Sequence, residues 1–190
     1  IKSVNNSASE IADNSMLSIE ALGEIRQDTQ SLHTQALSHI VATDLDSMLD
    51  IVEGLRDTQS GLAASLDEYE QFVSADDKDN FQALKDGIDQ FNYHLADLLA
   101  FSGAGENEKA YALANGELSD SADNVEAVAA KLIASATAGA DNARSDLNNV
   151  SQDSVRLTMV LILVSAAAFI AAVTVVVLFV IRPLVAVKNE

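Results

Sequence analysis

The sequence is poor in the residues that interrupt helices and in those that bind metals through sulfur. It has no cysteine, one proline and 8 glycines in 190 residues. Without cysteine, neither a disulfide framework nor a thiolate metal site can form. The scarcity of glycine and proline argues against a turn-rich β fold and favours long helices. The sequence therefore predicts an all-α protein.

Catalytic motifs are also missing. The three histidines, His33, His39 and His94, lie on separate stretches without the spacing of metal ligands. The sequence contains no nucleophile elbow, no phosphate-binding loop and no dinucleotide-binding glycine motif. We therefore expect no enzyme activity, no catalytic residue, no bound metal and no cofactor.

Positive charge is scarce as well. The chain carries 29 acidic and 11 basic residues, for a formal net charge of −18, and every acidic residue except Glu190 lies before residue 157. A surface this acidic repels nucleic acid and anionic lipid headgroups. We therefore expect no nucleic-acid partner and interpret the charge as a solvated coat on an exported domain.

One long apolar run stands apart from this acidic body. Residues 157–181 carry no charge, and Arg156 and Arg182 bracket them. As a helix the run is about 37 Å long, enough to cross a hydrocarbon core of about 30 Å with some tilt. Arg182 and Lys188 follow the run, which favours a cytoplasmic C-terminal side. We expect a transmembrane helix at 157–181, with residues 1–156 periplasmic or extracellular.

The acidic body shows the heptad repeat of packed helices. Apolar positions alternate at intervals of three and four over residues 45–73, broken chemically by Gln59, and again over residues 81–98. The intervening turn supplies an aspartate N-cap for the third helix. A looser seven-residue spacing over residues 1–42 includes Ile11, Ser18 and His39, and Asp44 is placed to cap the next helix. We interpret His39 as a satisfied histidine at the edge of the core.

The last helix is predicted to be the longest. We call the stripe of apolar positions along each helix its seam. The seam of this last helix starts after Asn115 and Gly116, contains a stutter near Gly139, and enters the apolar run without a breaker. We expect one helix over residues 117–181, on the order of 95 Å long. Gly103 and Gly105 end the third helix, and residues 106–114 form a short helical turn. Short links then predict an antiparallel up-down-up-down four-helix bundle whose last helix continues into a transmembrane helix.

This layout resembles the sensor region of bacterial methyl-accepting chemotaxis proteins. Ile181, Arg182, Pro183 and Leu184 resemble the start of the HAMP linker, and the sequence EKAYALANGEL at 108–118 is similar to the junction before the fourth helix. The resemblance implies a periplasmic sensor domain at 1–156 and the start of a cytoplasmic HAMP linker at 182–190. It also implies a bacterial inner-membrane receptor that is homodimeric through its first helix.

The same resemblance implies parts on both sides of this sequence. A first membrane helix would precede Ile1, and a cytoplasmic region that binds a kinase and an adaptor would follow Glu190. A small extracellular ligand would bind between the first and fourth helices, far from the membrane. Binding would displace the fourth helix, and the HAMP linker would respond to that motion.

Polar residues at the distal ends of these two helices are the predicted ligand contacts. They are Arg26, Gln30, His33, Thr34, Asn124, Lys131 and Thr137. Relatives that bind amino acids carry several arginines on the first helix, whereas this stretch has only Arg26, which argues against an acidic amino-acid ligand. Arg26 as an ordinary surface ion-pair partner, and His33 as a surface residue, remain alternatives.

Two other functions fit the same sequence. The sensor could belong to a histidine kinase or a diguanylate cyclase, or the helices could form a membrane-anchored stalk without a ligand. The sequence does not identify the ligand, its attractant or repellent sense, or the output module.

Overall fold

The computed structural model describes the backbone of residues 2–176, and every long element in it is a helix. The elements are α1 (Lys2–Val41), α2 (Leu45–Glu70), the short 3-10 helix η1 (Ala75–Asp77), α3 (Lys78–Gly103), α4 (Asn107–Asn115) and α5 (Glu117–Val176). The predicted all-α class is confirmed for this part of the chain. The helix boundaries lie close to those that the heptad pattern predicts.

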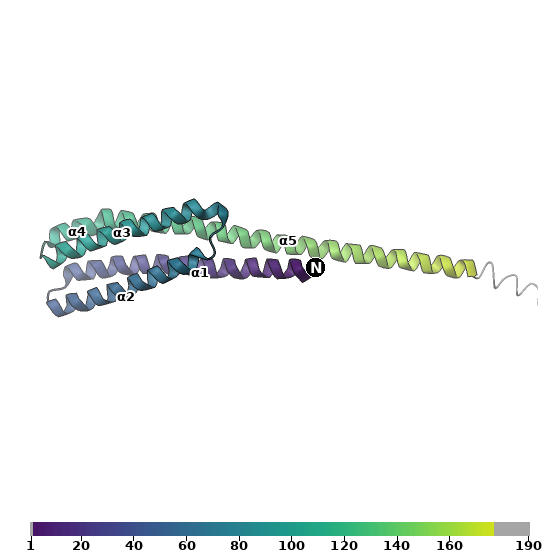
Figure 1. The fold of residues 1–190 in the computed structure, drawn as a ribbon, viewed down its shortest axis with the longest axis horizontal. Helices are drawn as coiled ribbons and strands as arrows, with labels where there is room; N and C mark the ends of the chain where they lie inside the picture. Colours follow the sequence, from purple (N-terminus) through teal and green to yellow (C-terminus); the bar gives the residue numbers. More distant parts are fainter. Residues whose placement is uncertain (1, 177–190) are drawn as a thin grey trace, which may run out of the picture.

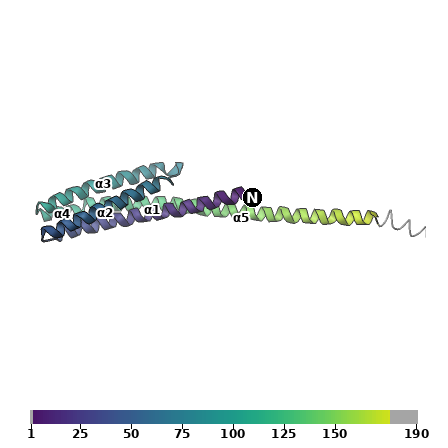
Figure 2. The same ribbon diagram turned by 60° about the horizontal axis from the view of Figure 1, so that its bottom comes forward.

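The four long helices run alternately up and down (Figures 1 and 2). Helices α1 and α2 form one hairpin, and α3 and α5 lie beside it. The short helix α4 packs against α3 and α5 at the end of the bundle opposite the α5 extension. Helix α5 continues well beyond the bundle, and the N-terminal part of α1 runs beside it past the ends of α2 and α3 (Figure 1). The bundle is therefore four helices thick at one end and two at the other.

The long last helix is continuous as far as the structure describes it. Helix α5 has 60 residues without a break, which confirms the predicted unbroken passage from the bundle past residue 155. Within the described part of the chain, no helix is both long enough and apolar enough to cross a membrane. Residues 177–181 of the predicted membrane segment, and the predicted linker at 182–190, lie outside the described residues.

Local polar contacts set the helix ends. The carboxylate of Asp44 accepts a hydrogen bond from the backbone N–H of Ser47 at 2.8 Å, as predicted for an N-cap, and this bond holds the pKa of Asp44 below its usual value. Asp77 occupies the predicted N-cap of α3 but makes no capping bond. Its Oδ2 instead accepts hydrogen bonds from Ser74 and Ser135, so that detail of the prediction is wrong. Gly105, with φ of 76°, allows the left-handed turn after α3.

The core follows the predicted seams where four helices meet. All six seam positions of α3 are buried, and so are three of the seam positions of α2: Phe81, Leu84, Ile88, Phe91, Leu95 and Leu98, with Leu55, Leu62 and Tyr69. Gln59 and Leu66, which lie between those three on α2, are half-buried. The prediction is wrong for Ile11 and Leu45, which are 46% and 69% exposed. Both lie toward the ends of their helices, where fewer neighbours cover them.

Polar members of the seams are satisfied within the protein. The buried hydroxyls of Ser18 and Thr29 donate to backbone carbonyls one turn earlier in α1. The side-chain amide of Gln59 donates to Asn92 at 2.9 Å and so links α2 to α3. These groups interrupt the apolar seam without leaving a buried donor unpaired, which limits their cost to the bundle.

His39 lies in the core at the end of the bundle farthest from the α5 extension. It is 4% exposed, and its Nδ1 lies 2.8 Å from the hydroxyl oxygen of Ser102. That hydroxyl donates to the carbonyl of His39 at 3.2 Å, so Nδ1 is the donor to Ser102. Burial lowers the pKa of His39, and the neutral ring is the form that the core accepts. The predicted satisfied histidine is confirmed.

Acid should destabilise the bundle through His39. The unfolded chain gains a proton there below about pH 6.5 whereas the folded core resists it, so the free energy of unfolding should fall as pH drops from 7 to 5. The slope from this one group is at most about 1.4 kcal/mol per pH unit. Urea unfolding followed by circular dichroism should show that His39→Gln has a flatter profile over this range. An unchanged slope in the variant would contradict the assignment.

Candidate functional site

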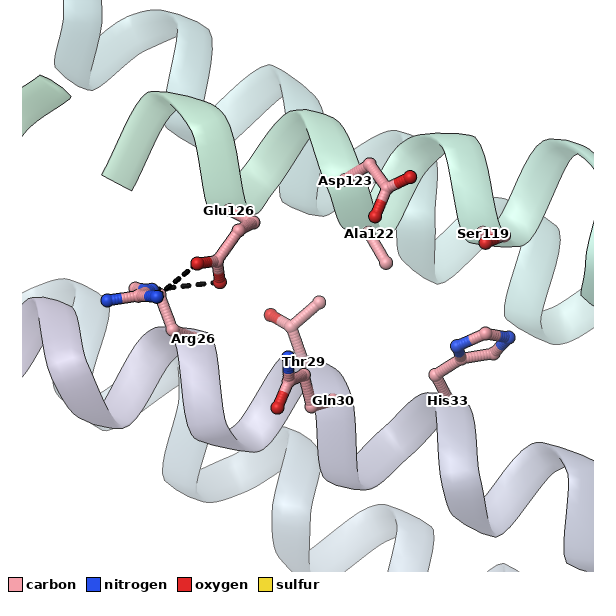
Figure 3. Close-up of a pocket in the computed structure, with 8 residues that line it drawn as sticks. All are labelled: Arg26, Thr29, Gln30, His33, Ser119, Ala122, Asp123 and Glu126. Atoms are coloured by element: carbon pink, nitrogen blue, oxygen red, sulfur yellow. Dashed lines mark hydrogen bonds and ion pairs between the residues drawn. The ribbon is translucent and has the colours of Figure 1, made fainter. Parts of the chain in front are cut away.

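A small cavity opens between α1 and α5, in the half of the bundle away from the α5 extension (Figure 3). It has a volume of about 110 Å³. Four residues of α1 face four residues of α5 across it: Arg26, Thr29, Gln30 and His33, with Ser119, Ala122, Asp123 and Glu126. On each helix these positions recur every three or four residues, so they form one face directly beside the core seam. A volume of this size holds a few water molecules or a small polar molecule.

An ion pair closes one end of the cavity. Arg26 donates from Nε to Oε2 of Glu126 at 2.8 Å, and its terminal nitrogen donates to the other carboxylate oxygen (Figure 3). These hydrogen bonds raise the pKa of Arg26 and lower that of Glu126. The pair is bidentate, but both side chains remain more than one third exposed. Arg26 is therefore already neutralised before any ligand arrives.

His33 forms the other end of the cavity. Its Nε2 lies 3.0 Å from the carbonyl oxygen of Ala114, and only a protonated nitrogen can donate to that acceptor. In the neutral ring Nδ1 is then an acceptor, and Figure 3 shows this nitrogen turned toward the middle of the cavity. The bond to Ala114 ties α1 to the end of α4, so the ring is held in place rather than left to rotate on the surface.

Other polar groups in the cavity are open to a ligand. The hydroxyl of Thr29 donates to the carbonyl of Ile25 at 2.8 Å, which leaves its oxygen as an acceptor. Among the described residues, the side chains of Gln30 and Asp123 make no hydrogen bond or ion pair. The charged groups that line the cavity are the guanidinium of Arg26 and the carboxylates of Asp123 and Glu126. This balance favours a neutral or cationic polar molecule and disfavours an anion.

The structure brings three of the seven predicted contacts together, namely Arg26, Gln30 and His33. The hydroxyls of Thr34 and Thr137 donate to carbonyls of their own helices. Lys131 is exposed and does not line the cavity. The amide of Asn124 lies 3.2 Å from the position of a Cβ at Gly87, so it points toward α3. These four residues do not border this cavity.

Sequence reasoning missed the α5 side of the site, because it selected residues by polarity rather than by face. On α1, Arg26 and His33 directly follow the buried residues Ile25 and Leu32. On α5, Ser119 and Glu126 likewise directly follow the buried residues Leu118 and Val125. The same register offset on both helices was readable from the seam and would have found these two contacts.

No cluster of three or more histidine, cysteine or carboxylate side chains able to hold a metal ion occurs among the described residues.

Comparison with known families agrees with this architecture. Residues 1–150 match the family described as the four helix bundle sensory module for signal transduction, and the protein belongs to that family. The predicted resemblance to the bundle sensors of chemotaxis receptors is thereby confirmed over these residues. Neither the curated proteins nor the solved structures include a significant match to the chain. The chain is a sensory module that acts in signal transduction.

The Arg26–Glu126 pair should contribute little to stability. Because both side chains are partly exposed, a double-mutant cycle with Arg26→Gln and Glu126→Gln should give a coupling free energy of about 0.2–1 kcal/mol. The coupling should shrink as salt is raised. Urea unfolding of the four proteins at low and high salt measures it. A coupling above about 2 kcal/mol would instead make the pair a structural requirement of the bundle.

Proposed function

We propose that this protein is the sensor region of a transmembrane chemoreceptor of the methyl-accepting type. A small extracellular molecule binds in the cavity between α1 and α5, and the resulting displacement of α5 crosses the membrane to a cytoplasmic signalling module. The observation that carries the proposal is that the cavity borders α5, the helix that extends farthest beyond the bundle. Family membership supports the sensory role.

The cavity limits the chemistry of the ligand. Arg26 is already paired with Glu126, and Asp123 adds a second carboxylate, so an acidic amino acid would face repulsion on binding. For a small molecule that donates hydrogen bonds, the wall offers two acceptors, the carboxylate of Asp123 and the Nδ1 atom of His33. We infer a compact, neutral or cationic polar ligand.

The same cavity suggests how binding could move α5. A ligand donor that engages Asp123 and an acceptor that engages Gln30 would draw the two helix faces into a new register. Helix α5 is about 90 Å long at 1.5 Å per residue, and packed helices shift between discrete arrangements rather than deform continuously. A displacement at the distal end is thus carried along the whole helix.

The membrane and the dimer belong to the same proposal. The uncharged run at 157–181 would form a transmembrane helix, with residues 1–156 in the periplasm or outside the cell and 182–190 opening a cytoplasmic HAMP linker. The host membrane would be the bacterial inner membrane. Exposed Met16 and Leu17 on α1, 68% and 42% accessible, support a homodimer through this helix. A kinase and an adaptor would bind the cytoplasmic part.

Two other assignments use the same bundle. A sensor of a histidine kinase or a diguanylate cyclase differs only in its output module. A stalk without a ligand would keep the bundle but would have no use for a polar cavity with unpaired groups beside the long helix. That cavity is the reason to favour a receptor.

The receptor proposal predicts a ligand response that depends on the cavity. Residues 1–190 would be joined to the cytoplasmic part of a chemotaxis receptor in a strain without its own receptors, and kinase activity would be recorded against a library of small polar metabolites. At least one compound should act saturably, and Asp123→Asn or Glu126→Gln should raise its half-effective concentration at least about tenfold. The matched variant Glu53→Gln, on the exposed side of α2, should leave the response unchanged.

A response that survives both cavity variants would move the ligand to another site. No response to any compound would favour the stalk.

The topology can be tested because the chain has no cysteine of its own. Single cysteines would replace Ser60, an exposed residue of α2, and Lys188, which follows the apolar run. A membrane-impermeant maleimide should label the first in intact spheroplasts and the second only after lysis. Equal labelling of both in intact spheroplasts would exclude a membrane crossing between them.

A further inference from the structure

A second and larger cavity lies nearer the end of the bundle from which α5 emerges. Its volume is about 450 Å³. The turn between α2 and α3 covers it, and α1 and α5 form its other walls near Ser18 and Gly139. In Figure 1 this is where the α2–α3 connection comes close to the two helices that continue beyond the bundle. The predicted seam stutter near Gly139 falls at this level.

Asp77 is the principal polar group of this cavity. Its Oδ2 accepts hydrogen bonds from the hydroxyl of Ser74 at 2.7 Å and from that of Ser135 at 2.9 Å. The bond from Ser135 joins α5 to the turn, across 58 residues of sequence. The other oxygen of Asp77 has no partner among the described residues. The carboxylate is therefore fixed in place by two donors and still has an oxygen free to accept.

Tyr69 contributes a hydroxyl without a partner. The residue is only 3% exposed, its ring packs edge-on against Phe81 at 5.6 Å between centroids, and it lines the cavity. Within the described part of the chain the Tyr69 hydroxyl makes no hydrogen bond. Burial, with a smaller contribution from the charge of Asp77, raises the pKa of Tyr69 to about 12, so the hydroxyl stays protonated. Among the described residues, Oε1 of Gln35 is the one buried polar side-chain atom without a partner, so the Tyr69 hydroxyl reaches the open cavity and can exchange water for a ligand.

The rest of the wall combines apolar, small and polar groups, among them the amides of Asn14 and Asn142. Ile11 and Phe72 supply apolar surface, and a Cβ placed at Gly139 would meet no atom within 4 Å, so the α5 side is open. The lining includes the carboxylates of Asp76 and Asp77 and contains no lysine, arginine or histidine among the described residues. The cavity thus combines negative charge, two aromatic rings and room for an organic body. Carboxylates and aromatic faces are the groups that recognise ammonium ions.

We propose that this cavity is a second ligand site, specific for an organic ammonium with an apolar body of aromatic size. The ammonium group donates to the free oxygen of Asp77 and to the hydroxyl oxygen of Tyr69, and the apolar body packs on Ile11 and Phe72. Because the ammonium draws on the carboxylate that holds Ser135, binding weakens the tie between α5 and the turn. Only this last effect rests on the proposed signalling role; binding itself does not.

The test compares probes that differ in charge but not in shape. The full chain, kept in solution with mild detergent, would be titrated by calorimetry with 2-phenylethylammonium and with its neutral counterpart 2-phenylethanol. The ammonium should bind saturably at one site per chain and at least about tenfold more tightly than the alcohol. Asp77→Asn should reduce the affinity for the ammonium at least about tenfold, because the charge is lost while the amide keeps its size.

The control is Asp79→Asn, which removes the same charge two residues away at an exposed position of α3 outside the cavity; it should bind the ammonium as the unaltered chain does. Since Asp77 also lies at a helix start, Tyr69→Phe provides a milder variant that keeps the ring and should weaken binding several-fold. Circular dichroism would confirm that each variant is folded. Equal affinity for the alcohol, equal losses in the two aspartate variants, or no saturable binding would each overturn the proposal.

Discussion

The packing of α1 against α5 is the contact on which the other features depend. Buried residues on the two helices, among them Ile25, Leu32, Val125 and Leu132, set their register. That register places Arg26 opposite Glu126 and His33 beside the end of α4. It also places Ser135 within reach of Asp77 in the α2–α3 turn. Both cavities are thus products of one apolar seam, and a shift of that seam would alter both.

The seams were predictable from the sequence because burial in a bundle repeats with the helix period. The six apolar residues of α3 show this most clearly, and the cap at Asp44 could be read from a single aspartate before a helix. Ile11 was misplaced because periodicity reports a face without reporting whether a neighbour covers it. Coverage depends on how far each partner helix extends, and that is a property of the whole bundle.

The candidate site was less predictable for a related reason. Polarity singled out Arg26 and His33, but it also singled out Asn124, which turns toward α3 and the space beside Gly87. The pairing of Arg26 with Glu126 joins residues 100 positions apart, and one sequence gives no direct measure of which face meets which. The hydrogen-bond partners of Asp77 were harder still to predict from the sequence, because they are hydroxyls from a turn and from a distant helix.

The unequal lengths of the helices have a mechanical consequence. Where α2 and α3 end, α5 is accompanied only by the first part of α1, so the assembly narrows from four rods to two (Figure 1). The bending stiffness of a bundle of rods falls steeply as its cross-section shrinks, whereas stiffness along the rods falls only in proportion to their number. Bending motions of the four-helix part are therefore largely taken up by flexing of the two-helix part formed by α1 and α5. Piston-like travel parallel to the α5 axis passes through it with little loss.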